Sequence, residues 1–385
     1  MWGAVGLDRC HNVADLRRVA RRRLPSPIFH YLDGGADDEY SLRRNTEAFD
    51  DYELIPNYLV DISRMDLSAK VLGRKIDMPI FCAPTGMSRL FHHEAEPAVA
   101  RTAAKFGTYY TLSTLSTTSI ERISDVCSGP KMFQIYILKD RGLTREFVAR
   151  CKTAKYDALC LTVDAVVAGN RERDRRTGMT MSPSFTLRSL ASFAAHPGWW
   201  LRAVTHPDFR LANLLHAKDA DPNSKVSVIE YVTKQFDRTV TWEDVAWLIG
   251  EWQGPFAIKG LQSVRDAKRA VEVGASAIMI SNHGGRQLDG APAPVDCIVP
   301  MRDAIGDALE LIVDGGVRRG THVLKALALG ANACSVGRAY LYGLAAGGER
   351  GVDRAFTLLR AEIERELALL GCGSLGCLTR EHIAR

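Results

Sequence analysis

Short apolar segments alternate with amphipathic segments over most of the chain. Segments such as EAEPAVARTAAKF and SVRDAKRAVEVG repeat their apolar residues every three or four positions, as a helix with one buried face does. The apolar segments between them are continuous, which is typical of strands in a parallel sheet that helices cover on both faces. Eight such segments occur, at residues 78–84, 108–113, 132–137, 158–164, 255–260, 277–283, 310–316 and 333–338.

Eight strand-and-helix units predict a closed barrel. The expected fold class is therefore α/β, with the architecture of a TIM (β/α)8 barrel. We expect this barrel to occupy about residues 76–365 of a single domain that covers residues 1–385. An N-terminal helical segment precedes it, with a helix that begins near Asn12 and ends before Pro25, and residues 351–371 are expected to form the last helix.

The regular spacing is interrupted once, between the fourth and fifth strands. About 90 residues separate these two strands, so a long insert is expected at about residues 172–250. Within it, residues 192–216 (SFAAHPGWWLRAVTHPDFRLANLLH) mix tryptophan, phenylalanine and leucine with arginine. This segment is shorter than the roughly 20 apolar residues that cross a bilayer. Two interpretations stay open: a segment in the membrane interface, or a lid packed on the barrel or on a neighbouring subunit.

Composition narrows the class of protein. The chain has 385 residues, 46% of them hydrophobic and 25% charged, which indicates a large folded core and not a disordered chain. The net charge of +5 is too small to indicate a nucleic-acid partner. Nine scattered cysteines without a CxxC pair predict free thiols and no metal site. With no signal peptide, we expect a cytoplasmic protein, either free or peripheral on the cytoplasmic face of the inner membrane.

Polar residues or glycines stand at the end of every predicted strand. In a TIM barrel the active site lies at the carboxyl ends of the strands, so these residues are expected to meet at one rim. In strand order they are the APTG motif, Ser113, Gln134 with Tyr136, Thr162 with Asp164, Lys259, Ser281 with His283, the DGG motif at 314–316, and Gly337 with Arg338.

The last two strands are followed by turns suited to an anion. The turns VDGGVRRG and SVGRAYLYG occupy the place where barrels often bind phosphate. Gly315, Gly316 and Gly337 allow backbone N–H groups to approach an anion, and Arg338 can pair with it. No GxGxxG motif opens the chain and no GxxxxGK[ST] motif occurs, so a dinucleotide fold or a P-loop is disfavoured.

Four ionisable side chains at the strand ends indicate acid–base chemistry. Lys259 can form a Schiff base or hold negative charge on a cofactor ring. His283 can take a proton, and Arg286, three residues later, can bind a carboxylate with two parallel hydrogen bonds. Asp164 can orient the imidazole and stabilise its charged form.

The sequence SNHGGRQLDG, residues 281–290, resembles the signature of the FMN-dependent 2-hydroxy acid dehydrogenases and oxidases. The resemblance covers nearly the whole chain. Further matching motifs are FHYLDGGADDEYSLRRN, APTG, FQIYILKDR, LTVD, IKG, DGGVRRGTHVLKALALGA and GRAYLYGLAAGGERGV.

The resemblance implies a role for each matching residue. It implies that His283 is the active-site base, supported by Asp164, and that Arg171 and Arg286 bind the substrate carboxylate. Tyr31 and Tyr136 are implied to hydrogen-bond the substrate. The implied FMN-binding residues are Ala83, Pro84, Thr85, Ser113, Gln134, Thr162, Lys259, Ser281, Asp314, Gly315, Gly316, Arg318, Gly337 and Arg338.

The resemblance also implies a reaction. We expect oxidation of an (S)-2-hydroxy acid, L-lactate to pyruvate first of all, with electrons passed to a quinone or cytochrome. Gly86 stands where the oxygen-using oxidases have alanine, and Leu115 where glycolate oxidase has tryptophan. Together with the Trp-rich insert, these residues are similar to the membrane-associated lactate and mandelate dehydrogenases. By the same analogy, we expect a homo-oligomer, most simply a tetramer.

Three alternatives remain at this point. The first is a mandelate-type or broader 2-hydroxy acid dehydrogenase, or an oxidase that forms hydrogen peroxide. The second is a phosphate-binding barrel lyase without flavin, in which Lys259 forms a Schiff base. The third is a binding protein without activity, which the complete set of His283, Arg286, Lys259 and Asp164 disfavours.

Overall fold

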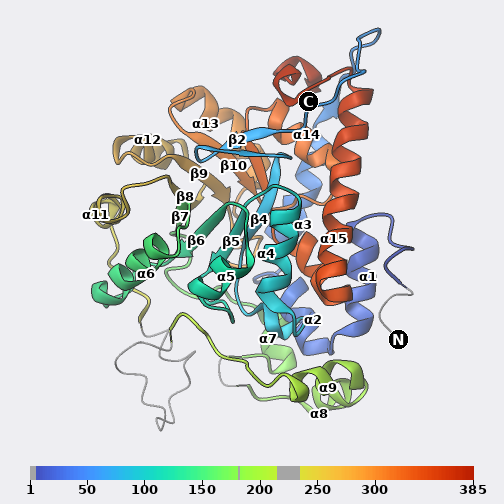
Figure 1. The fold of residues 1–385 in the computed structure, drawn as a ribbon, viewed down its shortest axis with the longest axis vertical. Helices are drawn as coiled ribbons and strands as arrows, with labels where there is room; N and C mark the ends of the chain where they lie inside the picture. Colours follow the sequence, from blue (N-terminus) through green and yellow to red (C-terminus); the bar gives the residue numbers. More distant parts are fainter. Residues whose placement is uncertain (1–5, 181–182, 215–234) are drawn as a thin grey trace.

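Eight parallel strands close into a barrel, as the sequence predicts (Figure 1). The computed structural model describes residues 6–180, 183–214 and 235–385. The barrel closes because β11 pairs with β4 and each other strand pairs with its neighbours. The strands are β4 (Ile80–Thr85), β5 (Tyr110–Ser113), β6 (Lys131–Ile135), β7 (Ala158–Thr162), β8 (Phe256–Leu261), β9 (Ala277–Ser281), β10 (Glu310–Asp314) and β11 (Ala333–Val336).

Helices surround the barrel and bury one face each against it. They are α4 (Ala95–Lys105), α5 (Ile120–Val126), α6 (Arg141–Thr153), α11 (Trp242–Trp252), α12 (Val264–Glu272), α13 (Ile298–Ile305), α14 (Gly320–Ala328) and α15 (Arg338–Leu369). The last helix begins earlier than the predicted residue 351, because the chain is helical from Arg338 and breaks at Gly347 and Gly348. A side chain at position 348 would meet the Glu94 carboxylate at 2.0 Å, so the break lies where the backbone packs too closely for a Cβ.

A hairpin closes the amino-terminal end of the barrel. Its strands are β2 (Ala69–Val71) and β3 (Arg74–Ile76), at the top of Figure 1. Val71, Leu72 and Ile76 pack with buried barrel side chains such as Phe81 and Met279 in one cluster. Because this end is filled, a ligand can enter only from the opposite rim, where the strands end.

The predicted strands agree with the observed ones to within two residues, but several were predicted too long at the carboxyl end. Tyr136, Asp164, His283, Gly316 and Arg338 were expected at strand ends. Tyr136 lies one residue beyond its strand, and the other four lie two residues beyond theirs. The backbone explains part of this, because His283 has a φ of 58° and Gly316 a φ of 77°, which a strand cannot adopt. Tyr136, Asp164, His283 and Gly316 therefore lie on loops above the rim, and Arg338 begins α15.

The N-terminal segment packs beside the barrel. The helix α1 (Val13–Arg23) begins after Asn12, whose side chain accepts a hydrogen bond from the Asp15 N–H, and ends before Pro25, as predicted. It packs along α15. Two further helices follow: α2 (Ser26–Asp33), which lies on the side of the strand ends, and α3 (Tyr40–Glu47), which lies beside the barrel (Figure 1).

The insert between β7 and β8 contributes helices on the same side as the rim. These are α7 (Glu172–Thr177), α8 (Leu187–Ala194) and α9 (Pro197–Thr205), at the bottom of Figure 1. Residues 181–182 and 215–234 of the predicted insert, and with them the last two residues of the segment 192–216, lie outside the described residues. The indole N–H of Trp199 donates to the Leu90 carbonyl at 2.8 Å, which ties α9 to the loop after β4. Among the described residues, no helix is long and apolar enough to cross a membrane.

A buried carboxylate joins the N-terminal segment to the rest of the fold. Asp33 accepts hydrogen bonds from Arg17 of α1, Arg173 of α7 and the Tyr342 hydroxyl of α15. Burial alone would raise the pKa of Asp33, but the hydrogen bonds from Arg17 and Tyr342 outweigh it and lower the pKa to about 2. The carboxylate form is therefore stabilised by folding.

Replacing this carboxylate is expected to destabilise the protein. A pKa lowered to about 2 corresponds to roughly 2–3 kcal/mol of stability at neutral pH. This stability is present above the unfolded-state pKa of about 4 and is lost as the pH falls through the folded-state pKa. Urea unfolding of Asp33→Asn should show this loss at pH 7 and a narrower difference from wild type below about pH 4. The exposed Asp38→Asn is the control, and equal stability of both variants would refute the assignment.

Candidate active site

A cavity of about 1340 Å³ opens at the rim where the barrel strands end. Nearly all residues that the sequence singles out line it, from Tyr31 of α2 to Arg338 at the start of α15. Asp164 and Ser281 are the exceptions among the predicted site residues. They lie directly behind the wall, where Asp164 contacts His283 and Ser281 contacts Lys259.

His283 and Asp164 form a hydrogen-bonded pair. Nδ1 of His283 lies 2.9 Å from Oδ1 of Asp164, so the carboxylate accepts the Nδ1 proton and leaves Nε2 as the atom with a free lone pair. Burial lowers the pKa of His283, although the Asp164 charge opposes this, so the imidazole is neutral near pH 7. For Asp164, burial raises the pKa, but the contact with His283 outweighs it and keeps the carboxylate ionised. The pair can accept a proton at Nε2.

Two guanidinium groups face the cavity without a carboxylate partner. Arg286 donates to the carbonyls of Tyr31 and Gly34, at 2.7 and 3.0 Å, and its Cζ lies 5.1 Å from the centre of the Tyr31 ring. Burial, together with the positive charge of Arg171, lowers the pKa of Arg286 to about 9. Among the described residues, no carboxylate lies within 4.0 Å of either arginine. Two neighbouring cations of this kind make a site for an anion.

The two tyrosines predicted to bind substrate come from opposite parts of the chain. Tyr31 lies on α2 and Tyr136 on the loop after β6, and both line the cavity. Burial raises the pKa of Tyr136, so its hydroxyl stays protonated and can donate a hydrogen bond.

Lys259 belongs to a buried network at the bottom of the cavity. Its Nζ lies 2.8 Å from Oδ2 of Asp314 and donates to Oγ of Ser281 at 2.9 Å. Ser281, Asp314 and Ser335 are register partners on neighbouring strands, which brings both serine hydroxyls to the same carboxylate. Burial would lower the pKa of Lys259, but Asp314 outweighs it and raises the pKa, so the amine stays charged. A Schiff base needs a neutral amine, so this environment disfavours the lyase alternative.

The turns after β10 and β11, where the sequence predicts an anion site, line the cavity. Gly316 approaches α3 so closely that a Cβ would lie 1.7 Å from the Asn45 carbonyl. Arg338 donates to the carbonyls of Leu32, Gly284 and Gly34, so it also ties α2 to the His283 loop. Neither Arg318 nor Arg338 has a carboxylate within 4.0 Å in the described part of the chain. Both guanidinium groups line the cavity and can receive a phosphate.

One buried donor in the cavity wall has no partner. Ser113 donates to Oε1 of Gln134 at 2.9 Å, and Nε2 of Gln134 is left without a hydrogen bond. An unpaired buried donor costs about 1–3 kcal/mol, which an acceptor atom on a bound ring would relieve. The isoalloxazine ring of FMN carries such acceptors, and its phosphate suits the turns described above. The residues present therefore fit FMN.

The outer half of the cavity was not predicted from the sequence. It is apolar, and Met87, Leu190, Phe193, Trp199 and Phe236 contribute to its wall. The aromatic content of the insert was the one available signal, whereas Met87 and Phe236 stand in no recognisable pattern. Asp289 anchors its loop by accepting hydrogen bonds from the N–H groups of Tyr40 and Ser41 at the start of α3.

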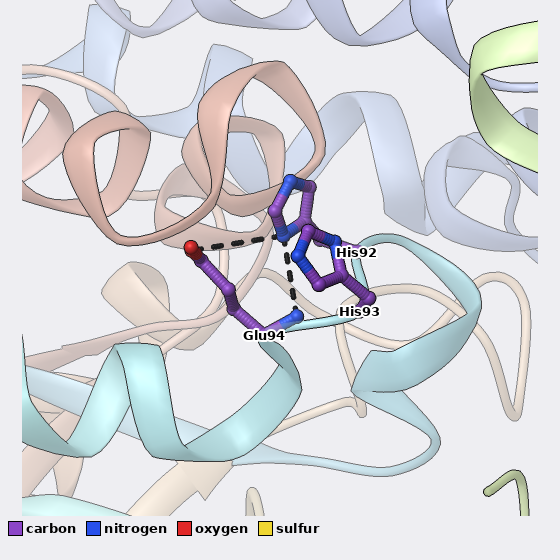
Figure 2. Close-up of side chains that lie close together, drawn as sticks. All are labelled: His92, His93 and Glu94. Carbon is purple, nitrogen blue, oxygen red and sulfur yellow. Dashed lines mark hydrogen bonds and ion pairs between the residues drawn. The ribbon is translucent and has the colours of Figure 1, made fainter. Parts of the chain in front are cut away.

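In the described part of the chain, one group of side chains converges as metal ligands do: His92, His93 and Glu94 (Figure 2). Arg202 of α9 donates to Nε2 of His92 at 3.0 Å, and the Glu94 N–H donates to Nδ1 of His92 at 3.3 Å. Burial, with the neighbouring charges of His93 and Arg202, lowers the pKa of His92 to about 3. These surroundings disfavour a cation. We assign the group to the packing of α9, where the ring of His206 lies against that of His93.

Removing one guanidinium from the anion site is expected to weaken FMN binding. A hydrogen bond to a charged group contributes about 1.5–3 kcal/mol, so Arg318→Gln should raise the FMN dissociation constant roughly 10- to 100-fold. Flavin fluorescence on dilution of the purified protein measures this. The control is Arg319→Gln, since Arg319 pairs with Glu362 and does not line the cavity. If both variants hold FMN equally well, the phosphate does not lie at Arg318.

The chain is similar to enzymes with several 2-hydroxy acid substrates. It is 41% identical over 368 residues to the L-lactate oxidase of Nostoc sp., covering 94% of this chain and 95% of that enzyme. It is 38% identical over 372 residues to the (S)-mandelate dehydrogenase of Pseudomonas putida, covering 97% and 93%. The crystal structure of the monotopic membrane protein (S)-mandelate dehydrogenase superposes with a TM-score of 0.93 at 37% identity, covering 97% of this chain and 99% of that one.

The family follows from these similarities together with the site. The family model described as FMN-dependent dehydrogenase matches residues 20–385. The barrel, the buried imidazole–carboxylate pair and the anion-binding turns agree with that match. The chain therefore belongs to the FMN-dependent dehydrogenase family, as a flavoprotein that oxidises 2-hydroxy acids.

Proposed function

We propose that this enzyme oxidises L-lactate to pyruvate and that its electrons pass to a quinone or cytochrome. The observation that carries the proposal is the position of His283, with a free Nε2, in the same cavity as Arg171 and Arg286. A 2-hydroxy acid has a carboxylate for the two guanidinium groups and a neighbouring hydroxyl for the imidazole. This arrangement suits a small hydroxy acid better than a neutral alcohol.

The residues divide the reaction between them. Arg171 and Arg286 bind the carboxylate, and the hydroxyls of Tyr31 and Tyr136 hydrogen-bond the substrate. Nε2 of His283 takes the proton of the substrate hydroxyl, and Asp164 stabilises the imidazolium that results. FMN supplies the two-electron acceptor.

The quinone or cytochrome acceptor has separate support. At Gly86, a Cβ would lie 3.1 Å from both Cβ and the carbonyl oxygen of Leu115, so the alanine of the oxygen-using enzymes would be crowded here.

The helices α8 and α9 expose Leu187, Leu201 and Val204, with exposed fractions of 86%, 54% and 68%. Apolar residues on a surface helix suit a membrane interface. We therefore propose peripheral attachment to the cytoplasmic face of the membrane, and we retain the homotetramer as a prediction.

A second candidate is an aromatic substrate such as (S)-mandelate. The wall beside Tyr136 is apolar, with Met87, Leu115, Val166 and Phe236 around it. Leu115 leaves space that a tryptophan at this position would fill. A wide apolar pocket of this kind favours a substrate side chain larger than methyl.

Steady-state kinetics with two substrates and two acceptors test the proposal. L-lactate and (S)-mandelate are compared with an artificial electron acceptor under anaerobic conditions, and then with oxygen alone. We expect turnover of L-lactate with the artificial acceptor and slow turnover with oxygen. Fast turnover with oxygen, with formation of hydrogen peroxide, would show that the enzyme is an oxidase and not a dehydrogenase. Turnover of (S)-mandelate alone would favour the second candidate.

A larger side chain at position 115 is expected to lower the activity with (S)-mandelate more than the activity with L-lactate. Overpacking costs about 1–3 kcal/mol, so Leu115→Trp should lower kcat/KM for (S)-mandelate roughly 5- to 150-fold. L-lactate, with its single methyl group, should lose less. Leu115→Met conserves the side-chain volume and serves as the control. Equal losses for both substrates would show that Leu115 does not border the substrate side chain.

A further inference from the structure

Two loops carry the four ionisable groups assigned to the chemistry. The loop at residues 164–171, after β7, carries Asp164 and Arg171. The loop at residues 281–290, after β9, carries His283 and Arg286. The strand β8 separates β7 from β9 in the barrel, so no strand pairing sets the position of one loop against the other.

The side-chain amide of Gln287 bridges these loops. Its Nε2 donates to the carbonyls of Asp164 and Val167, at 2.9 and 2.8 Å. Its Oε1 accepts from the Gly169 N–H at 3.0 Å. One side chain on the second loop therefore holds three backbone positions of the first.

This hydrogen-bonding pattern fixes both the orientation and the role of the amide. Two carbonyl partners and one N–H partner fit only one placement of the amide nitrogen and oxygen. Both N–H donors are then used on the backbone, although Gln287 borders the cavity. The amide has no donor left for a substrate, so any effect it has on the reaction acts through the loop that it holds.

The first loop is also held beside Arg171, where the Asn170 carbonyl accepts from the Asp37 N–H at 2.9 Å and the Asn170 amide donates to Oδ1 of Asp37 at 2.7 Å. The middle of the loop is more exposed. Val166 and Val167 are each 51% exposed, so apolar burial contributes little there. The backbones of the two loops also lie close together at Gly169, where a Cβ would lie 2.2 Å from the Arg286 carbonyl. The Arg171 Nε–H contacts the same carbonyl at 3.4 Å, a long hydrogen bond. A shift of the first loop would therefore move Asp164 and Arg171 relative to His283 and Arg286.

We propose that Gln287 is a positioning residue for 2-hydroxy acid oxidation, which sets Asp164 against His283 and Arg171 beside Arg286 by holding three backbone groups of the facing loop. This proposal rests on the roles assigned to those four residues under the proposed function. It adds a residue that touches neither the substrate nor the FMN.

The test compares Gln287→Ala and Gln287→Glu with wild type and with Leu288→Ala. The alanine removes all three hydrogen bonds. The glutamate keeps the shape of the side chain but turns oxygens toward the carbonyls of Asp164 and Val167. Leu288 is the next residue, 74% exposed and outside the cavity wall, so its alanine variant is the matched control.

We expect both Gln287 variants to keep their FMN and to lose kcat/KM. Displacing reacting groups by about 1 Å can cost on the order of 100-fold, so a loss of roughly 10- to 100-fold is expected for L-lactate. Gln287→Glu should be no better than Gln287→Ala, because its shape is right and its hydrogen bonding is wrong. Leu288→Ala should match wild type.

The pH profile separates positioning from general destabilisation. The negative charge of Asp164 raises the pKa of His283, so a loosened pair should move the acidic limb of kcat/KM to lower pH. A variant that is merely less stable would keep that limb in place. The affinity for pyruvate, measured by the change in flavin absorbance, should also be lower in the Gln287 variants, because Arg171 is displaced from its position beside Arg286.

The outcomes are distinct. Wild-type kinetics and an unmoved acidic limb in Gln287→Ala would overturn the positioning role. Loss of FMN from both variants would also overturn it, because the amide would then support the cofactor site. If wild type itself oxidises no 2-hydroxy acid, the proposed function fails, and pyruvate binding still reports whether Gln287 positions the two arginines.

Discussion

The hydrogen bond between His283 and Asp164 is the contact on which the proposed chemistry depends. It joins residues that are 119 positions apart in the chain and lie on the loops after β7 and β9. Both strands pair in parallel with β8, which brings these loops to the same rim, and the filled amino-terminal end leaves that rim as the entrance. The bond fixes the imidazole tautomer, so Nε2 faces the cavity as an acceptor.

Charge is distributed unevenly around this pair. The charge of Lys259 is neutralised by Asp314, and its Nζ also donates to Ser281, so Lys259 is a fixed part of the wall. Within the described ranges, the hydrogen bonds of Arg286 go to backbone carbonyls, and burial and Arg171 lower its pKa. A buried cation without a counter-ion is costly, and a bound carboxylate relieves that cost. Under the proposed function, this difference separates Lys259, which shapes the site, from Arg286, which would bind the substrate carboxylate.

Much of the fold and the site could be predicted from the sequence, because both depend on local patterns. The apolar segments located all eight strands, and residues such as Gln134 and Lys259 were found by their places at strand ends. His283 and Asp164 were identified, but their position beyond the strands was not. The error arises because the pattern of apolar residues does not show where a strand stops pairing with its neighbours. Near His283 this happens where the backbone adopts a positive φ.

The remainder depends on contacts distant in sequence. Nothing near Phe236 or Met87 indicates that they border the cavity, because Phe236 is placed there by the packing of the insert and Met87 by the turn after β4. The hydrogen bonds of Gln287 are likewise visible only once two loops meet.

Anaerobic mixing of the purified flavoprotein with L-lactate tests the central claim most directly. If His283 takes the hydroxyl proton, the flavin absorbance of wild type bleaches within the enzyme's turnover time. A His283→Asn variant should retain its FMN and bind pyruvate, yet bleach at least about 1000-fold more slowly, near the upper part of the range for loss of a general base. Bleaching of that variant at the wild-type rate would contradict the account.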